Sequence, residues 1–232
     1  MGRKLRHVLF FLLIILKEPN MPEAPCLCEP FSRVLCTKGL TSIPQNLPTS
    51  ICSLCLENNL ITKIEAGTFA NLPRLEQLKL GGNLISEIHP GSFANLPMLE
   101  KLYLDNNKIR KIENGTFVNL PQLQRLVLGH NRIITICSSI FANLPQLQKL
   151  YLEHNQITTK HTGTLIANLP QLKSLFLNTN KITTIHPGTF GNLPQLQELW
   201  LANNDITDIY SGTFANLNQL KYLYSYRNDE WS

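Results

Sequence analysis

The sequence predicts an α/β repeat solenoid, a right-handed crescent of stacked coils with a parallel β-sheet on its concave face and irregular or short-helical segments on its convex face. Two observations predict it. The 232 residues include 41 leucines and 23 asparagines, and average composition gives no reason for these two residue types to rise together. From residue 51 both recur every 24 residues, and self-similarity at a fixed period is the signature of a repeat architecture.

The amino-terminal residues 1–25 are expected to lie outside this fold. Basic residues precede a nine-residue apolar run at 8–16. Such a run is too short for a bilayer, which needs about 20 residues, but it is typical of a secretory signal. We therefore expect a signal peptide, a secreted chain and no membrane span. No small-x-small cleavage triplet follows the run, so an uncleaved signal or a wrong gene start is the alternative.

Each repeat unit carries the pattern Leu-x-x-Leu-x-Leu-x-x-Asn-x-Ile, which is clearest from Leu75 to Ile85. The alternation Leu-x-Leu predicts a short strand whose leucines point into the coil. No single unit can bury its own leucines, so stacking of units makes the core continuous. We expect residues 51–232 to form seven full units and a truncated eighth.

Two further columns run along the predicted array. One asparagine falls at the same position of each unit: Asn59, Asn83, Asn107, Asn131, Asn155, Asn180, Asn204 and Asn228. Its amide can pair with the backbone groups that leave the strand unpaired. A phenylalanine column lies on the far side: Phe69, Phe93, Phe117, Phe141, Phe190 and Phe214. Because these side chains are bulkier than the strand-side packing, the outer edge should be wider and the array should curve.

The fifth unit departs from the pattern, because it is 25 residues long, with Lys160 in place of an isoleucine and Leu165 in place of the phenylalanine. The extra residue follows Gly163, on the convex side, so the concave sheet should stay in register. We expect Lys160 to extend outward, since an unpaired buried ammonium group would be costly.

Residues 26–50 contain Cys26, Cys28 and Cys36, followed by the run GLTSIP-x-x-LP. This segment resembles the cysteine-rich amino-terminal cap of extracellular leucine-rich repeat proteins. The repeat phrase FANLPQLQ is similar to the arrays of variable lymphocyte receptors and Slit proteins, in a group that also includes Toll-like receptor ectodomains. The resemblance implies that residues 26–50 cap the exposed end of the core.

By the same resemblance Cys26 pairs with Cys36, and Cys28 loses its partner because the first cysteine of the family cap is absent. Three more cysteines lie inside the repeats: Cys52, Cys55 and Cys137. Six cysteines allow 15 pairings, so the remaining connectivity stays open. A metal site built from the two closely spaced cysteine pairs is the alternative, but a secreted cap is the commoner use of such cysteines.

The carboxyl end of the array lacks a cysteine-rich cap, and polar residues replace apolar ones at Ser225 and Glu230. An uncovered edge strand can pair with another chain, so self-association through this edge is expected. A truncated gene model is the alternative.

The residue between the two strand leucines should face solvent on the concave side. In five units it is aromatic: Tyr103, Tyr151, Phe176, Trp200 and Tyr224. The position two residues earlier is basic in three consecutive units: Lys101, Arg125 and Lys149. An exposed aromatic stripe beside cations often marks an interaction surface, so we predict that these eight residues bind a ligand. The alternative is that the aromatic side chains only pack across neighbouring strands.

A pair of histidines and one glycosylation sequon bear on metal binding and on modification. His130 and His154 occupy the same position in adjacent units and should stack in solvated loops. A zinc site would need a third ligand, so we predict no metal. The only N-glycosylation sequon is Asn114-Gly115-Thr116, in a convex connection. We expect Asn114 to carry a glycan in a secreted chain, with an unmodified turn as the alternative.

The sequence contains no nucleophile elbow, no zinc-protease helix motif and no phosphate-binding glycine loop, so we predict neither catalysis nor a cofactor. The net charge of +5 is too dispersed to argue for nucleic acid. The resemblance implies a non-enzymatic extracellular recognition module whose concave sheet binds a protein or glycan, as in innate immune recognition. An adhesion, matrix or guidance-type protein that self-associates, or a fragment of a longer receptor, is the alternative.

Overall fold

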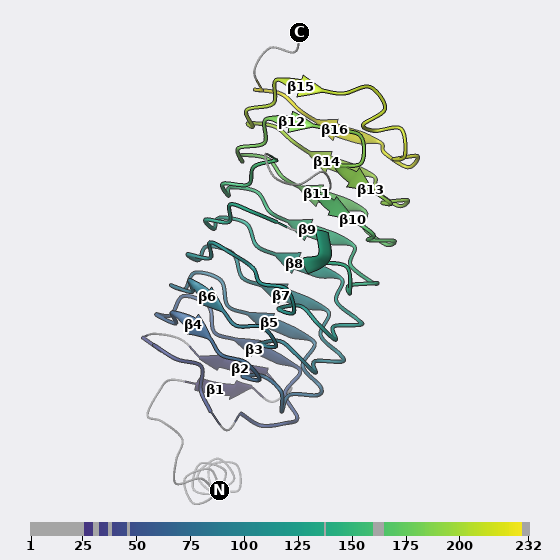
Figure 1. Cartoon of the computed structure of the whole chain (residues 1–232). Coiled ribbons are helices and arrows are strands. Elements are labelled where there is room, and N and C mark those ends of the chain that lie inside the picture. Colours follow the sequence, from purple (N-terminus) through teal and green to yellow (C-terminus); the bar gives the residue numbers. More distant parts are fainter. Residues whose placement is uncertain are drawn as a thin grey trace, which may run out of the picture.

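The computed structural model describes residues 26–29, 33–36, 39–45, 47–136, 138–159 and 165–228. These residues form a single stack of coils, with β1 (Cys26–Glu29) near one end and β16 (Tyr222–Tyr224) near the other (Figure 1). Successive coils each contribute one strand to a common sheet. The repeat solenoid predicted from the sequence is therefore confirmed.

The common sheet has ten strands in the order β1-β2-β3-β5-β7-β8-β9-β11-β14-β16. Only β1 and β2 (Arg33–Cys36) pair antiparallel, because the short link between them leaves no room for a crossover. Every later pair is parallel. The strands between β2 and β16 are β3 (Ser53–Cys55), β5 (Gln77–Lys79), β7 (Lys101–Tyr103), β8 (Arg125–Val127), β9 (Lys149–Tyr151), β11 (Ser174–Phe176) and β14 (Glu198–Trp200).

The register of this sheet places equivalent residues of neighbouring units side by side. Leu126 in β8 lies opposite Leu150 in β9. Leu150 in turn lies opposite Leu175 in β11, although the intervening unit has one extra residue. The prediction that the longer fifth unit keeps the concave sheet in register is confirmed.

The core is a continuous column of apolar side chains inside the coils. The central strand leucines, such as Leu102 and Leu126, are fully buried. On the far side, the ring centroids of Phe69 and Phe93 are 5.8 Å apart and those of Phe117 and Phe141 are 6.2 Å apart. Strands in a sheet are only about 4.8 Å apart, so the convex side is the wider one and the stack curves toward the strands.

The asparagine column ties each unit to its neighbour. Asn131 Nδ2 donates to the carbonyl oxygens of Leu104 (2.9 Å) and Leu128 (3.0 Å), and its Oδ1 accepts from the Ile109 amide at 3.1 Å. The same arrangement recurs at Asn59, Asn83, Asn107, Asn155, Asn180 and Asn204. The predicted pairing of these amides with turn backbone is confirmed, and it joins consecutive units by hydrogen bonds as well as by packing.

The convex side is more ordered than the sequence suggested. Short parallel ladders join neighbouring coils there: β4 (Lys63–Ile64) with β6 (Glu87–Ile88), β10 (Ile166–Ala167) with β13 (Phe190–Gly191), and β12 (Thr184–Ile185) with β15 (Asp208–Ile209). A single 3₁₀ turn, η1 (Ser138–Ile140), is described in this region. Identical spacing brings equivalent convex segments into register, so their backbone groups pair wherever both are extended.

At the amino-terminal end of the sheet, Cys36 is disulfide-bonded. The backbone of Cys26 lies directly opposite that of Cys36 across the β1–β2 pair. The side chain of Cys26 lies outside the described residues, so the Cys26–Cys36 pairing stays a prediction. Cys52 and Cys55 carry free thiols.

Several predictions fall outside the described part of the chain. They concern the signal at residues 1–25, the thiols of Cys28 and Cys137, and the side chains of Lys160 and Glu230.

Candidate binding surface on the concave sheet

Three-residue strands place their side chains on two sides of the sheet. In β7, β8 and β9 the central leucine is buried and both flanking residues are half-buried. The flanking residues therefore form the outward surface of the ten-stranded sheet, here called the concave face. All eight residues predicted to bind a ligand lie on it: Tyr103, Tyr151, Phe176, Trp200, Tyr224, Lys101, Arg125 and Lys149.

Four of the five aromatic residues form one parallel stack, here called the aromatic stack. The ring centroids of Tyr151 and Phe176 are 4.5 Å apart with planes 3° from parallel. Phe176 and Trp200 are 5.7 Å apart, and Trp200 and Tyr224 are 3.9 Å apart. Because the register places one ring on each successive strand, the ring faces cover one another and the ring edges border the concave face.

Tyr103 stands apart from this stack, because Val127 occupies the equivalent position on the intervening strand. It interacts with a cation instead, since the Lys79 ammonium lies 5.8 Å from its ring centroid. The Arg125 guanidinium lies 5.7 Å from the Tyr151 ring. Lys79 was not among the predicted ligand-binding residues, although it holds the same repeat position as Tyr103 one unit earlier. We call Lys79, Lys101, Arg125 and Lys149 the cationic row.

Two acidic side chains of the concave face lie flat over glycines of the preceding unit. A Cβ at Gly129 would come within 2.5 Å of Glu153 Oε1, and one at Gly81 within 3.0 Å of Asp105 Oδ1. Glu153 Oε2 is buried and has no hydrogen-bond partner among the described residues. Burial raises the pKa of Glu153, while a backbone hydrogen bond and the charge of His154 oppose the shift. Glu153 therefore holds its proton more readily than an ordinary glutamate.

The two loop histidines stack as predicted, with ring centroids of His130 and His154 4.1 Å apart and planes 12° from parallel. Both residues have positive φ, 54° and 53°, in the tight turn that follows each strand. Parallel imidazoles direct their nitrogens side by side rather than toward a common point. Within the described ranges, no group of three or more histidine, cysteine, aspartate or glutamate side chains has the arrangement of a metal site.

Burial makes the Cys55 thiol and the Tyr151 phenol of the concave face harder to deprotonate. Cys55 Sγ donates to Glu57 Oε2 at 3.3 Å, and burial raises the pKa of the Cys55 thiol. Burial also raises the pKa of Tyr151, with the Arg125 charge opposing it. A nucleophilic thiolate needs the opposite shift, so the Cys55 thiol is a poor nucleophile.

Asn114 lies on the convex side, away from the concave face. Its side chain is exposed, and Ser139 Oγ donates to Asn114 Oδ1 at 3.1 Å. Thr116, the third residue of the sequon, is fully buried.

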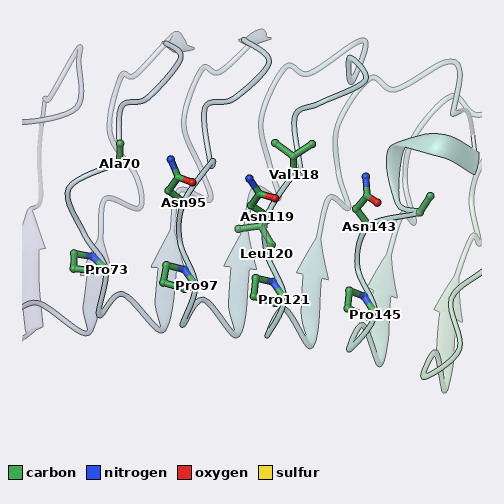
Figure 2. A pocket seen from close by; sticks show the side chains of 11 residues that line it. Ala70, Pro73, Asn95, Pro97, Val118, Asn119, Leu120, Pro121, Asn143 and Pro145 are labelled. Atoms are coloured by element: carbon green, nitrogen blue, oxygen red, sulfur yellow. The ribbon is translucent and has the colours of Figure 1, made fainter.

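A groove of 860 Å³ lies on the flank that leads from the convex turns back to the strands. Figure 2 shows its lining as rows of equivalent residues: Pro73, Pro97, Pro121 and Pro145 in one row, with Asn95, Asn119 and Asn143 in a second. The repeated Asn-Leu-Pro of the sequence is the signal that could have revealed it. The groove contains none of the predicted site residues and no charged side chain lines it.

The fold and the repeat pattern together define the class of protein. A family profile described as leucine-rich repeat matches residues 49–109, 97–157 and 167–229, and a second, described as two copies of leucine-rich repeats, matches residues 145–188. These matches cover most of the chain. The protein therefore belongs to the leucine-rich repeat family.

Curated relatives resemble only part of this chain. Leucine-rich repeat-containing G-protein coupled receptor 4 of Bos taurus is 40% identical over 65 residues, 28% of this chain and 7% of the receptor. Leucine-rich repeat-containing protein 4 of Homo sapiens is 41% identical over 63 residues, 27% of this chain and 10% of that protein. Decorin of Bos taurus is 42% identical over 65 residues, 27% of this chain and 18% of decorin. The similarity thus spans less than a fifth of each relative.

Solved structures match over most of this chain. The TLR13–ssRNA13 complex superimposes with a TM-score of 0.70 at 27% identity, over 88% of this chain and 33% of TLR13. Human 5T4, also titled Wnt-activated inhibitory factor 1 or trophoblast glycoprotein, superimposes with a TM-score of 0.55 at 25% identity, over 82% of this chain and 83% of 5T4.

Proposed function

We propose that this chain is a non-enzymatic extracellular recognition module that binds a protein or glycan on its concave face. The observation that carries the proposal is the gathering of the aromatic stack and the cationic row on one surface of the sheet. The aromatic stack and Arg125 are of the residue types that dominate binding energy at interfaces. Innate immune recognition is the setting that the repeat phrase favours.

The extracellular location rests on two observations, a disulfide and an exposed sequon. Cys36 is disulfide-bonded, and disulfides persist mainly in oxidising compartments. Asn114 is exposed within a sequon, so we propose that it carries a glycan, on the side opposite the concave face. The described residues include no helix with the length and apolar character needed to cross a membrane.

The structural neighbours support a binding role in general terms. TLR13 was crystallised with ssRNA13, so a solenoid with this fold holds a macromolecule in that protein. Its ligand is not carried over here, because the present chain spans a third of TLR13 and its concave face has its own side chains.

The test is an array of purified extracellular proteins and of microbial glycans, probed with the secreted chain and two variants. Tyr151→Ala with Trp200→Ala should weaken each specific signal at least about tenfold, because two aromatic side chains of the concave face are removed. Tyr210→Ala, which removes a half-exposed aromatic from a convex loop, is the matched control and should keep the signals. Thermal unfolding of each variant checks the fold. Signals that survive the double substitution would reject the concave face as the binding surface.

A second candidate function is adhesion through self-association. Leu223 in β16 is 39% exposed, whereas the equivalent Leu199 in β14 is fully buried. Tyr222 and Tyr226 beside it are also exposed, and within the described residues no strand pairs with the outer edge of β16. Light scattering over a concentration series should then show oligomers that Leu223→Glu abolishes. A mass that stays monomeric at every concentration would reject this candidate.

A further inference from the structure

The cationic row forms no ion pair with any residue that the structure describes. Among the described residues the ion pairs join Lys63 or His89 to Glu65 and Lys111 to Glu113, all away from the concave face. None involves a member of the cationic row. Lys101, Arg125 and Lys149 lie side by side in register, so their backbones are separated by about 4.8 Å per strand.

Like charges at this spacing repel one another, and no ion pair among the described residues offsets that repulsion. Its contacts with the Tyr103 and Tyr151 rings orient two of the cations without neutralising them. Glu76 and Glu100 line the same hollow as Lys101, but the described residues contain no ion pair between either acid and Lys101. Asp105 lies over Gly81 and accepts from Asn106 Nδ2, and Glu153 lies over Gly129 with its pKa raised by burial.

The aromatic stack restricts which ligands fit the other half of the face. Sugars and nucleobases bind best on the electron-rich faces of aromatic rings. Here the faces of Phe176 and Trp200 are covered on both sides by neighbouring rings. Phe176 and Trp200 therefore offer only their ring edges, and an edge contact suits the irregular apolar side chains of a protein better than a flat sugar or base.

We propose that the partner is a protein whose contact surface has two parts: an acidic part that faces the cationic row and an apolar part that faces the edges of the aromatic stack. Charge complementarity argues for the acidic part, since four unpaired cations gain partners only on binding. The covered ring faces argue against a glycan or single-stranded nucleic acid. This inference rests on the proposed role of the concave face as the binding surface.

The test uses a phage-displayed library of random linear peptides, selected on the secreted chain, with a heparin oligosaccharide and oligo-deoxythymidylate as competing probes. The expected peptides carry a cluster of aspartate or glutamate beside a cluster of apolar residues. Synthetic copies should bind the Lys101→Ala, Arg125→Ala, Lys149→Ala variant about tenfold to a hundredfold more weakly, and the loss should shrink as salt rises. Trp200→Ala with Tyr224→Ala should weaken them about tenfold, with little change in salt dependence.

The matched control is Lys108→Ala, Arg110→Ala, Arg132→Ala, which removes three exposed cations from loops outside the strands and changes net charge by the same amount. It should leave peptide affinity within about twofold. Selected peptides without acidic residues, or peptides whose affinity the cationic variant leaves unchanged, would overturn the inference. If those peptides still depended on Trp200 and Tyr224, the concave face would remain the proposed binding surface. Binding of heparin or the oligonucleotide that depends on both the cationic row and the aromatic stack would also overturn the inference. Peptides indifferent to every concave variant would overturn the proposed function itself.

Discussion

The two halves of the concave face use their outward-facing strand residues for opposite purposes. Toward the amino terminus, strands β5 to β9 present separated cations that find no ionic partner among the described residues. Toward the carboxyl terminus, strands β9 to β16 present rings that stack on one another. The cationic half therefore carries charges without ionic partners among the described residues. The aromatic half already covers much of its ring surface by stacking.

This difference shows how little the repeat constrains the outward residue. The position between the two strand leucines holds Lys79, Val127 or Trp200 while the leucines on either side stay fully buried. The fold is carried by the inward leucines and the asparagine column, so the outward positions are free to encode a ligand. Specificity on such a surface can change without any change in the core.

The largest loss of stability should come from removing a member of the asparagine column, which supports both halves of the concave face. Asn131→Ala removes the amide that serves Leu104, Leu128 and Ile109, and leaves buried backbone groups without partners. Each unsatisfied group costs about 1–3 kcal/mol, so the free energy of unfolding should fall by about 3 kcal/mol or more. Urea denaturation measures it.

The matched control is Asn228→Ala at the same repeat position in the last described unit. Asn228 is only half-buried, so water can replace its hydrogen bonds and the loss should be smaller. Equal losses at the two positions would contradict the view that the column acts through buried backbone groups.

The next largest loss of stability should distinguish the aromatic half of the concave face from the cationic half. Phe176→Ala removes a ring that stacks on both sides, and each aromatic pair contributes about 0.5–1.5 kcal/mol, so stability should fall by about 2 kcal/mol. Lys101→Ala breaks no ion pair among the described residues and should stay within about 0.5 kcal/mol of wild type. Thermal and urea unfolding of both variants give the comparison. A loss at Lys101 as large as that at Phe176 would mean that the cationic half is also self-stabilising.

The sequence was sufficient to predict the fold because the residues that recur in each repeat are also the residues that pack in the core. Leu-x-Leu marks the strand and the inward column, and one asparagine per unit marks the turn, so strands, register and core follow directly. The concave residues could be located for the same reason. Their interactions could not, because stacking of Tyr151 on Phe176 and the position of Glu153 over Gly129 depend on side-chain rotamers. The convex ladders were missed because their two-residue strands have no period of their own.

A smaller effect should come from filling the space that Glu153 occupies. In Gly129→Ala the new Cβ would come within 2.5 Å of Glu153 Oε1, so the carboxylate must move. Because the carboxylate is the far end of a flexible side chain, its displacement should cost no more than about 1 kcal/mol. Gly81→Ala is the matched control, since its Cβ would lie 3.0 Å from Asp105 Oδ1 and the smaller shift should cost less. Urea denaturation compares them, and a larger loss of stability in Gly81→Ala than in Gly129→Ala would contradict this order.

The smallest effect should be a dependence of stability on pH that Glu153 contributes. Because burial raises the folded-state pKa of Glu153, the folded protein binds this proton more tightly than the unfolded chain does. Its destabilising effect is fully present above the folded-state pKa, is relieved as the pH falls through it, and is absent below the unfolded value of 4.5. Relative to Glu153→Gln, wild type should therefore gain stability as the pH is lowered from neutral toward that value.

Glu65 gives the opposite control, because a hydrogen bond from Lys63 lowers the pKa of Glu65. Relative to Glu65→Gln, wild type should therefore lose stability over the acid range. Urea midpoints at a series of pH values measure both, and a Glu153→Gln curve parallel to wild type would show that the carboxylate is as well solvated in the folded state as in the unfolded chain.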